Sequence, residues 1–284
     1  MRIIIDGMGG DFAPLEPLRG AAEAVRELGV EMIVTGGEAK LRACAGENRI
    51  PLDGITFVDA PRVIPMEAEP TSLLKEYSDC SMAVGMKMVA DGEGDAFVSA
   101  GSTGALLVGA TFLVKRIKGV KRPAIGTMIP AQGGRFYLLC DAGANHDCRP
   151  EMLTQFAVMG SAYYEKIIGT ERPRVGLINI GAEETKGTEL QVAALPLLKN
   201  LPGIHFIGNV EARDLPLGGC DVAVCDGFTG NVVLKLIEGM AKFFSHMLKD
   251  MLLRSTKTKI AALLLKDGVQ EFKSKIDASA YGGA

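Results

Sequence analysis

The sequence lacks the excess of positive charge that nucleic-acid-binding proteins carry. Its 284 residues include 31 Lys and Arg and 34 Asp and Glu, which gives a net charge of −3 at pH 7 with histidine neutral. Binding to a phosphate backbone needs a broad excess of Lys and Arg. The composition therefore excludes nucleic acid as the main partner, and any basic site must be local.

Cysteine and histidine are few and scattered. The six cysteines show no Cys-x-x-Cys spacing that would hold zinc, and they form no dense framework of the kind found in small secreted domains. The three histidines lie far apart in sequence and have no metal-ligand neighbour at helical spacing. We therefore expect reduced thiols in a cytoplasmic protein, with no metal and no other cofactor.

Long apolar runs are also absent. No run approaches the roughly 20 residues that a membrane-spanning helix requires. The N-terminal MRIIID reaches an acidic residue after three isoleucines, which is shorter than the apolar core of a signal peptide. We expect a chain that does not cross a membrane, although it can still lie on one.

What is present is an alternation of short β-branched runs with stretches of helical periodicity. One such stretch, residues 18–28, is followed by Gly29 as a helix stop. The alternation predicts an α/β fold with a mostly parallel sheet covered by helices on both faces. No linker or repeat forces a boundary, so we expect one domain over residues 1–284. The expected strands are residues 3–5, 32–35, 55–58, 96–99, 136–140, 175–180, 205–207 and 222–225.

Several expected strands end in segments that are richer in Gly, Asp and Asn than a turn needs. Ligands of parallel α/β folds collect at the carboxyl ends of the strands, so these segments could line one crevice. The segments are IDGMGGD (5–11), AGSTGA (100–105), DAGAN (141–145), GAEETKG (181–187), GNVEARD (208–214) and DGFTGN (226–231).

The segment Gly101-Ser102-Thr103-Gly104 follows a strand and opens an apolar helix. Free backbone N–H groups and the positive helix end would converge there on an anion, which makes the turn a candidate phosphate cradle. An ordinary strand-to-helix turn explains the pattern about equally well. Neither this segment nor residues 7–10 fits Gly-x-Gly-x-x-Gly or the P-loop, so a dinucleotide or ATP site is not indicated.

Two polar residues in the later segments are candidates for chemistry. Lys186 lies just beyond the expected strand 175–180, where a cation could neutralise phosphate or polarise a carbonyl; most lysines, however, are solvated surface residues. Asn231 begins a long helix and could donate to an oxyanion, although spacing alone favours a role as the helix cap.

Together, five segments closely resemble the acyl-ACP:phosphate acyltransferase (PlsX) family. They are IDGMGGD (5–11), SAGSTGA (99–105), GNVEARD (208–214), CDGFTGN (225–231) and YGGA (281–284), in order along the whole chain. The resemblance implies a three-layer α/β/α fold related to isopropylmalate dehydrogenases and phosphotransacetylases. It also implies a homodimer that works at the membrane surface in phospholipid synthesis. The family moves the acyl group of acyl carrier protein (ACP) onto phosphate, for later use by a glycerol-3-phosphate acyltransferase.

The sequence departs from the family pattern in two places. The family usually has Asn in its Gly-Asn-Thr-Gly loop, where this chain has Ser102, so a side-chain donor is altered. The family also usually continues beyond Tyr-Gly-Gly-Ala into a further strand and a helix, whereas this sequence ends at Ala284.

The expected chemistry needs no catalytic triad, and the sequence offers none. Phosphate is a competent nucleophile at neutral pH, and a thiolate leaves easily because the pKa of a thiol is only about 8.5. The protein therefore has to hold two reactants close and stabilise negative charge. For catalysis we expect Lys186, Asn231 and Asp226. We expect phosphate to bind within reach of Lys186. The residues expected to bind phosphate or the other substrate are Asp6, Gly9, Gly10, Gly101, Ser102, Thr103, Gly104, Asn209, Thr229 and Gly230.

Two local basic regions are candidates for contacts with partners. The densest positive stretch follows the helix that opens at residues 101–104. It predicts a surface that binds the acidic carrier protein. Basic residues that complement the negative end of the preceding helix explain the same stretch about equally well. Its members are Lys115, Arg116, Lys118, Lys121 and Arg122.

The second basic region belongs to a helical segment expected at about residues 240–278. Residues 249–275 hold seven basic and three acidic residues, a local charge of +4. Within it an apolar run is far too short to span a bilayer, and we expect it to dock on an anionic membrane. A core or dimer contact is the alternative, and only the family resemblance favours lipid over it. The membrane residues expected are Ile260, Leu263, Leu264 and Leu265.

Two other functions fit the same sequence. A metal- and NAD-dependent hydroxyacid dehydrogenase of related fold would use carboxylates such as Asp6, Asp11, Asp141 and Asp226 for Mg²⁺, and thermal shift with NAD and Mg²⁺ would reveal it. A membrane scaffold without activity would bind vesicles but form no acyl phosphate. The sequence does not indicate which acyl chain is preferred or which surface forms the dimer.

Overall fold

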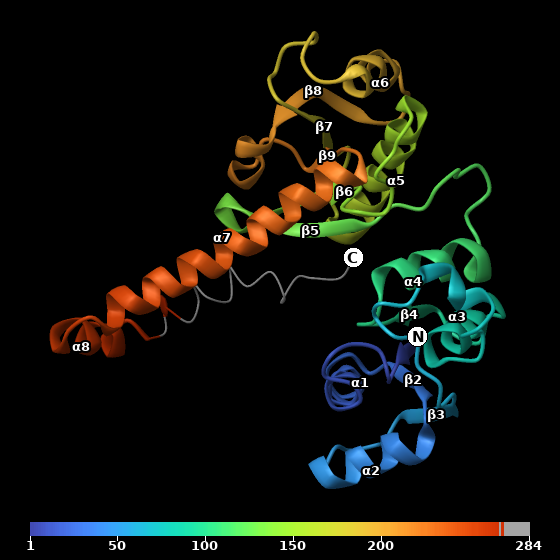
Figure 1. The fold of residues 1–284 in the computed structure, drawn as a ribbon. Helices are drawn as coiled ribbons and strands as arrows, with labels where there is room; N and C mark the ends of the chain where they lie inside the picture. Colours follow the sequence, from blue (N-terminus) through green and yellow to red (C-terminus); the bar gives the residue numbers. More distant parts are fainter. Residues whose placement is uncertain (267, 270–284) are drawn as a thin grey trace. The chain divides into compact units, whose positions relative to one another are not determined.

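The computed structural model describes residues 1–266, 268 and 269, and the chain divides into two compact units, Met1–Pro123 and Ala124–Ala284. We call them unit 1 and unit 2, and Figure 1 labels the elements of each. The expectation of one domain over residues 1–284 stays a prediction. The motif at 281–284 and the end of the expected helical segment lie outside the described residues.

Unit 1 contains a four-stranded parallel sheet in the order β3-β2-β1-β4. Its strands are β-branched runs, which suit a strand buried on both faces. Its elements are β1 (Arg2–Asp6), α1 (Leu15–Leu28), β2 (Glu31–Gly36), α2 (Glu38–Asn48), β3 (Ile55–Asp59), a 3₁₀ turn (Pro70–Leu74), α3 (Ser81–Ala90), β4 (Ala96–Val98), α4 (Thr103–Gly109) and a π-helical turn (Ala110–Val114).

Helices cover both faces of the unit 1 sheet. On one face Val34 packs with Leu18 of α1 and Leu41 of α2. On the other face Ile4 lies against α3, and α3 packs with α4. The helix stop predicted at Gly29 is confirmed, because this residue ends α1 with a φ of 63°.

Unit 2 contains a five-stranded sheet in the order β5-β6-β9-β7-β8, parallel except for the β5-β6 pair. One face packs on α5 and α6, and the other packs on the beginning of α7 and a 3₁₀ turn. Its elements are β5 (Gly126–Ala131), a 3₁₀ turn (Gln132–Gly134), β6 (Arg135–Cys140), α5 (Pro150–Ile168), β7 (Arg174–Asn179), α6 (Glu189–Lys199), β8 (His205–Glu211), a 3₁₀ turn (Ala212–Leu217), β9 (Val222–Val224), α7 (Gly227–Leu253) and α8 (Thr256–Leu264).

The predicted fold class, with mostly parallel strands between helices, is therefore confirmed. Two strands differ in detail from expectation. The sequence does not predict β5, because Gly126 and Pro130 interrupt the apolar pattern; this strand lies at the sheet edge, where a proline is tolerated. β8 continues past residue 207 to Glu211. The continuation passes through Gly208, whose φ is 99°, and the pairing of β8 with β7 shifts its register at this point.

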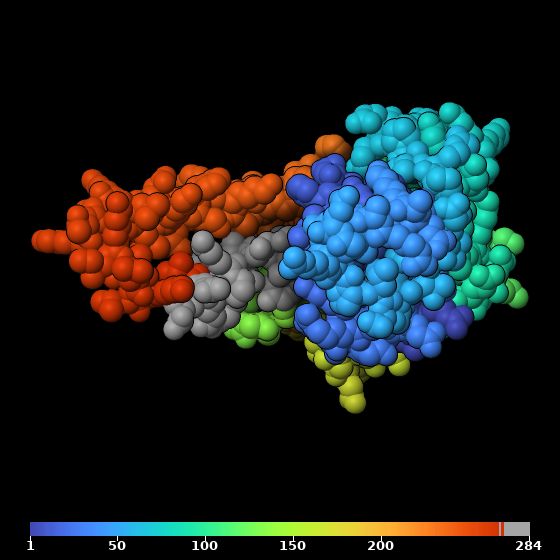
Figure 2. All heavy atoms as spheres, turned by 90° about the horizontal axis from the view of Figure 1, so that it is seen from below, coloured from blue at the N-terminus to red at the C-terminus, as the bar shows by residue number. Residues whose placement is uncertain are grey.

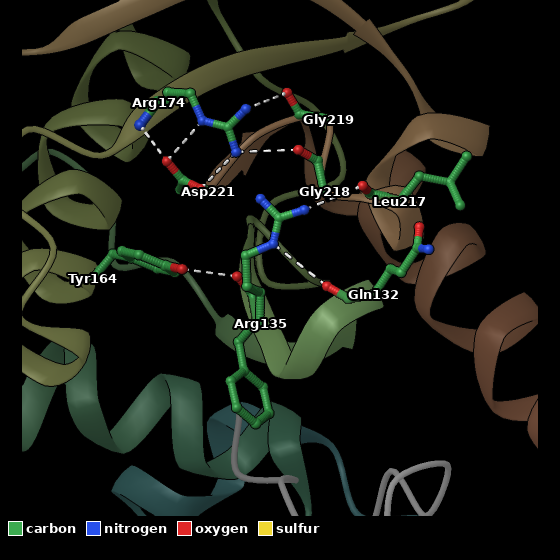
Figure 3. A network of polar contacts seen from close by, with 9 residues as sticks. Gln132, Arg135, Tyr164, Arg174, Leu217, Gly218, Gly219 and Asp221 are labelled. Atoms are coloured by element: carbon green, nitrogen blue, oxygen red, sulfur yellow. Dashed lines mark hydrogen bonds and ion pairs between the residues drawn. The ribbon is translucent and has the colours of Figure 1, made fainter.

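The amino end of the unit 2 sheet is held by an ion pair (Figure 3). The guanidinium of Arg174 donates to both carboxylate oxygens of Asp221, at 2.8 and 3.1 Å, and to the carbonyl of Gly218 at 3.1 Å. Burial alone would raise the pKa of Asp221, but the hydrogen bonds and charge of Arg174 outweigh it and lower the pKa. The pair therefore stabilises the fold above the ordinary carboxyl pKa, and its contribution is lost as the pH falls through the lowered value.

Beyond residue 237, α7 runs away from the unit 2 sheet and α8 follows at its far end (Figure 1). Figure 2 shows one face of this arm, with α7 in orange and α8 in red. The long helix that the sequence predicts to begin at Asn231 begins at Gly227. Six apolar side chains, spaced by three or four residues along one helical face, are exposed: Val232, Leu236, Met240, Phe243, Met247 and Met251.

Candidate functional site

In unit 1 the ends of β1 and β4 are joined by a buried carboxylate. Asp6, only 2% exposed, accepts a bond from the backbone N–H of Met8 at 3.1 Å and one from the Ser99 hydroxyl at 2.9 Å. Ser99 Oγ in turn accepts from the backbone N–H of Gly101 at 3.0 Å. Because a carboxylate repels a phosphate dianion, these contacts favour a role for Asp6 in holding the two loops rather than in binding phosphate directly.

Glycine allows these two loops to approach each other. A Cβ atom on Gly9 would lie 2.4 Å from Asp6 Oδ2, and one on Gly101 would lie 2.9 Å from Met82 Cε and 3.5 Å from the Cα of Gly9. Gly10 has a φ of 95°, which a larger residue rarely adopts. The structure thus brings together segments 5–11 and 99–104, as the sequence predicts for neighbouring strand ends.

A small pocket opens between these loops and the segment 63–66. Its volume is about 180 Å³, below the roughly 300–1,000 Å³ of most ligand clefts, so it suits a small group rather than a long chain. Asp6, Gly9, Gly10 and Gly101 line it, together with apolar side chains such as Met8.

The turn at 101–104 opens α4 as predicted. Ser102 is the N-cap residue, and its hydroxyl accepts from the backbone N–H of Ala105 at 3.4 Å. Thr103 is the first helical residue and is exposed, and Gly104 lies against Pro70. The hydroxyl hydrogen of Ser102 is left to donate elsewhere, so the residue that replaces the family's Asn still offers a donor.

In unit 2 the segment after β6 is organised around Asp141, which is fully buried. Oδ1 accepts from the backbone N–H groups of Ile125, Gly143 and Ala144 at 3.0, 3.1 and 2.9 Å. Oδ2 accepts from the backbone N–H and the side-chain amide of Asn145 at 2.7 and 2.8 Å. The sequence places Asp141 in a motif but does not indicate this role, because it depends on five donors that only the fold gathers.

The start of α7 packs directly on this segment. Gly227 donates its N–H to the carbonyl of Asn145 at 2.7 Å, and a Cβ atom on Gly230 would lie 1.9 Å from the carbonyl oxygen of Asp141. The N-cap of α7 is Asp226, whose carboxylate accepts from Thr229 N and Thr229 Oγ1 at 2.9 and 2.8 Å. The interpretation of Asn231 as the helix cap is therefore wrong.

Asn231 itself lies in the first turns of α7 and is exposed. Its side chain would be 3.7 Å from a Cβ atom on Gly143, so it lies over the loop that follows β6. Its amide is therefore placed to donate to a ligand, whereas the carboxylate of Asp226 is already bonded to its own helix. The catalytic roles of both residues stay predictions.

Lys186 lies in the loop between β7 and α6 and is exposed. Its backbone N–H donates to the carbonyl of Glu183 at 3.2 Å. That carbonyl also accepts from the Asn209 amide at 2.8 Å, so Asn209 holds this loop. Within residues 1–266, 268 and 269, Lys186 forms no salt bridge, whereas Lys199 pairs with Glu184 of the same loop.

No cysteine of unit 2 is placed as a nucleophile. Cys148 lies beside the start of α7, and burial raises the pKa of its thiol to about 11. Cys225 is fully buried, and its thiol pKa is raised well above the ordinary value by the same cause. Neither is a thiolate at neutral pH, so a covalent acyl-cysteine intermediate is not favoured.

The remaining sequence candidates lie on the surface. The carrier-protein candidates follow the π-helical turn after α4, all five are exposed, and Arg116 donates to the carbonyl of Lys121. The four membrane candidates are exposed on or just after α8, with Leu264 at 83%. They make no core contact in the described chain. Of the three contacts considered for this apolar run, with the core, with a second copy or with a membrane, the last two remain.

Two features are absent among the described residues. None of the helices is both long enough and apolar enough to cross a bilayer. In the same part of the chain, no three His, Cys, Asp or Glu side chains gather in a way that could hold a metal ion.

Comparisons with known proteins cover the whole chain. A family model described as "Fatty acid synthesis protein" matches residues 1–284. The phosphate acyltransferase of Alkaliphilus oremlandii is 45% identical over 284 residues, covering 100% of this chain and 84% of that protein. The phosphate acyltransferase of Desulforamulus reducens is 47% identical over 290 residues, with the same coverage.

Solved structures show the same fold at low identity. A phosphotransacetylase from Streptococcus pyogenes aligns with a TM-score of 0.65 and 18% identity, over 85% of this chain and 82% of that one. EutD phosphotransacetylase from Staphylococcus aureus aligns with a TM-score of 0.62 and 20% identity, with the same coverage.

The fold therefore places the chain among α/β proteins with the phosphotransacetylase architecture. The family match and the full-length relatives go further. The chain belongs to the phosphate acyltransferase family, a family of acyl-transferring enzymes linked to fatty acid synthesis.

Proposed function

We propose that this protein transfers the acyl group of acyl-ACP to inorganic phosphate, releasing acyl phosphate and free ACP for phosphatidic acid synthesis. Family membership supports acyl transfer over the dehydrogenase alternative. The observation that carries the mechanism is the Lys186 loop, where a cation without a salt bridge in the described chain stands at the carboxyl end of β7. Such a cation can bind the charge of phosphate or of the transition state.

The reaction as proposed balances without a covalent enzyme intermediate. A phosphate oxygen attacks the thioester carbon, the tetrahedral oxyanion collapses, and the C–S bond breaks to release the thiolate of the carrier. Asn231 would donate to the oxyanion, and Lys186 would neutralise charge on phosphate.

The decisive assay measures acyl-ACP consumption with and without phosphate. We expect one free ACP thiol per acyl phosphate, the latter trapped with hydroxylamine, and no turnover when phosphate is omitted. Consumption that continues without phosphate and yields free fatty acid would contradict the proposal.

The same assay at rising salt reports on docking of the acidic carrier, which the basic residues 115–122 would favour at low ionic strength.

Lys186→Ala tests the phosphate role. Because a charged contact is lost, we expect the phosphate KM to rise by about tenfold or more while the fold is retained. Lys166→Ala is the matched control, since Lys166 is an exposed lysine in the last turn of α5. An unchanged phosphate KM in Lys186→Ala would remove Lys186 from the mechanism.

The exposed stripe of α7 supports the expected homodimer. Apolar residues at spacings of three and four form a seam that a second copy of the same helix can cover. The described chain itself leaves this seam in water, which is unfavourable for side chains of this size. We therefore propose that α7 pairs with α7 of a second copy.

The membrane contact is proposed at α8. Leu263 and Leu264 are 74% and 83% exposed, beside basic residues that suit an anionic surface. Leu263→Glu with Leu264→Glu should lower binding to anionic vesicles at least about tenfold and preserve acyl phosphate formation in solution. Flotation measures this, with Leu28→Glu at the end of α1 as an equally exposed control. A double variant that still floats would place the contact elsewhere.

A further inference from the structure

The residue that ends β7 holds both ends of the Lys186 loop. Asn179 is 8% exposed. Its Oδ1 accepts from the backbone N–H of Ile180 at 2.8 Å, and its Nδ2 donates to the backbone carbonyl of Lys186 at 2.9 Å. One buried amide therefore fixes the first residue of the loop and the lysine itself.

The other side of this contact leaves no room for movement. Gly187 follows the lysine with a φ of 103°, and a Cβ atom there would lie 2.7 Å from Asn179 Oδ1 and 2.8 Å from Gln191 Cβ. Gln191 and Thr188 form the capping box that begins α6. Position 187, directly after the lysine, therefore has room only for glycine, because the Asn179 amide lies on one side and the capped start of α6 lies on the other.

The stem of Lys186 passes over Gly181. A Cβ atom on the buried Gly181 would lie 3.2 Å from Lys186 Cγ and 2.7 Å from Glu183 Oε2, so the stem crosses the loop where glycine leaves space. The charged end remains exposed. Because its backbone is held by Asn179, the lysine has less conformational entropy to lose when it binds an anion.

Asn179 and Asn209 do not hold the loop equally. Asn209 bonds the carbonyl of Glu183, three residues before the lysine, and its buried Oδ1 has no partner in the part of the chain that the structure describes. Asn179 uses both ends of its amide, and one of them meets the carbonyl of the lysine itself. We propose that Asn179 is a positioning residue that sets Lys186 for phosphate; this inference rests on the proposed role of Lys186.

Two variants disturb this contact by different means. Asn179→Asp keeps the shape but turns the donor that faces the Lys186 carbonyl into an acceptor. Gly187→Ala introduces no charge and presses on the same amide from the other side. Asn200→Asp is the matched control, because the Asn200 amide also donates to a backbone carbonyl at 2.9 Å, but at the end of α6.

We expect both variants to raise the phosphate KM by about tenfold, the effect of one lost hydrogen bond that orients a charged group. The KM for acyl-ACP should stay within about twofold of the parent, as should both constants in Asn200→Asp. In a Lys186→Ala background neither variant should raise the phosphate KM further, since a positioning residue has nothing left to position.

The outcomes separate the two claims. If Lys186→Ala alone leaves the phosphate KM unchanged, the proposed role of Lys186 fails and this inference falls with it. If Lys186→Ala raises it but the Asn179 and Gly187 variants do not, or if their effects add to that of Lys186→Ala, only the inference fails. Failure of both variants to fold, seen by circular dichroism, would also overturn it, because the contact would then serve the fold alone.

Discussion

Asp141→Ala is expected to destabilise unit 2 by about 4 kcal/mol or more, or to prevent its folding. The carboxylate is fully buried and accepts five hydrogen bonds. A buried donor left without a partner costs about 1–3 kcal/mol, and alanine at position 141 would leave several N–H donors without a partner. Asparagine should rescue little, because both oxygens face N–H donors and a new NH₂ group would meet one of them.

Urea unfolding followed by circular dichroism measures this loss. Asp147→Ala is the matched control: Asp147 is exposed in the same segment, and the expected change is within about 0.5 kcal/mol. A midpoint for Asp141→Ala close to that of the parent would show that the loop does not depend on the carboxylate.

Asp141 also shows where sequence reasoning stops. The motif is visible in the sequence, and a carboxylate at a strand end suggests a magnesium ligand as readily as a loop anchor. What decides between them is the set of N–H groups around it, one of which comes from Ile125, sixteen residues earlier. A pattern of residue types does not contain that information, because it arises when β5 pairs with β6.

The strands illustrate the same limit in a milder form. Short apolar runs, many of them rich in β-branched residues, locate every parallel strand, because such runs suit burial between two layers of helices. The edge strand β5 escapes because an edge tolerates the glycine and the proline that would argue against a central strand. The helix cap at Asp226 is within reach of the sequence, since Asp is a favoured N-cap residue, but spacing alone favours Asn231 as the cap.

The sequence carries a signal for the role of Asn179. A polar residue stands inside the apolar run 175–180, where burial makes an unpaired amide costly. Such a residue must find partners, and the nearest backbone groups belong to the glycine-rich loop that follows. Polar residues that end a buried strand before such a loop are therefore candidates for loop anchors in related sequences.

Gly230→Ala and Gly239→Ala should change stability in opposite directions, although both lie in α7. Helix propensity alone favours alanine over glycine by about 1 kcal/mol in a helix interior. At Gly239 nothing lies within 4 Å of the added Cβ, so we expect a gain of up to about 1 kcal/mol.

At Gly230 the Cβ would lie 1.9 Å from the Asp141 carbonyl oxygen, a backbone atom, and 3.0 Å from Cys225 Sγ. The backbone oxygen cannot move without displacing the Asp141 loop from the start of α7, so we expect a loss of about 3 kcal/mol or more. Urea midpoints of the two variants, measured at one protein concentration, give the comparison. Because the same substitution is made in the same helix, propensity cancels between the two, and the difference measures the close approach of α7 to the Asp141 loop. If Gly230→Ala were as stable as Gly239→Ala, the two segments would not be in the contact that places Asn231 over the loop after β6.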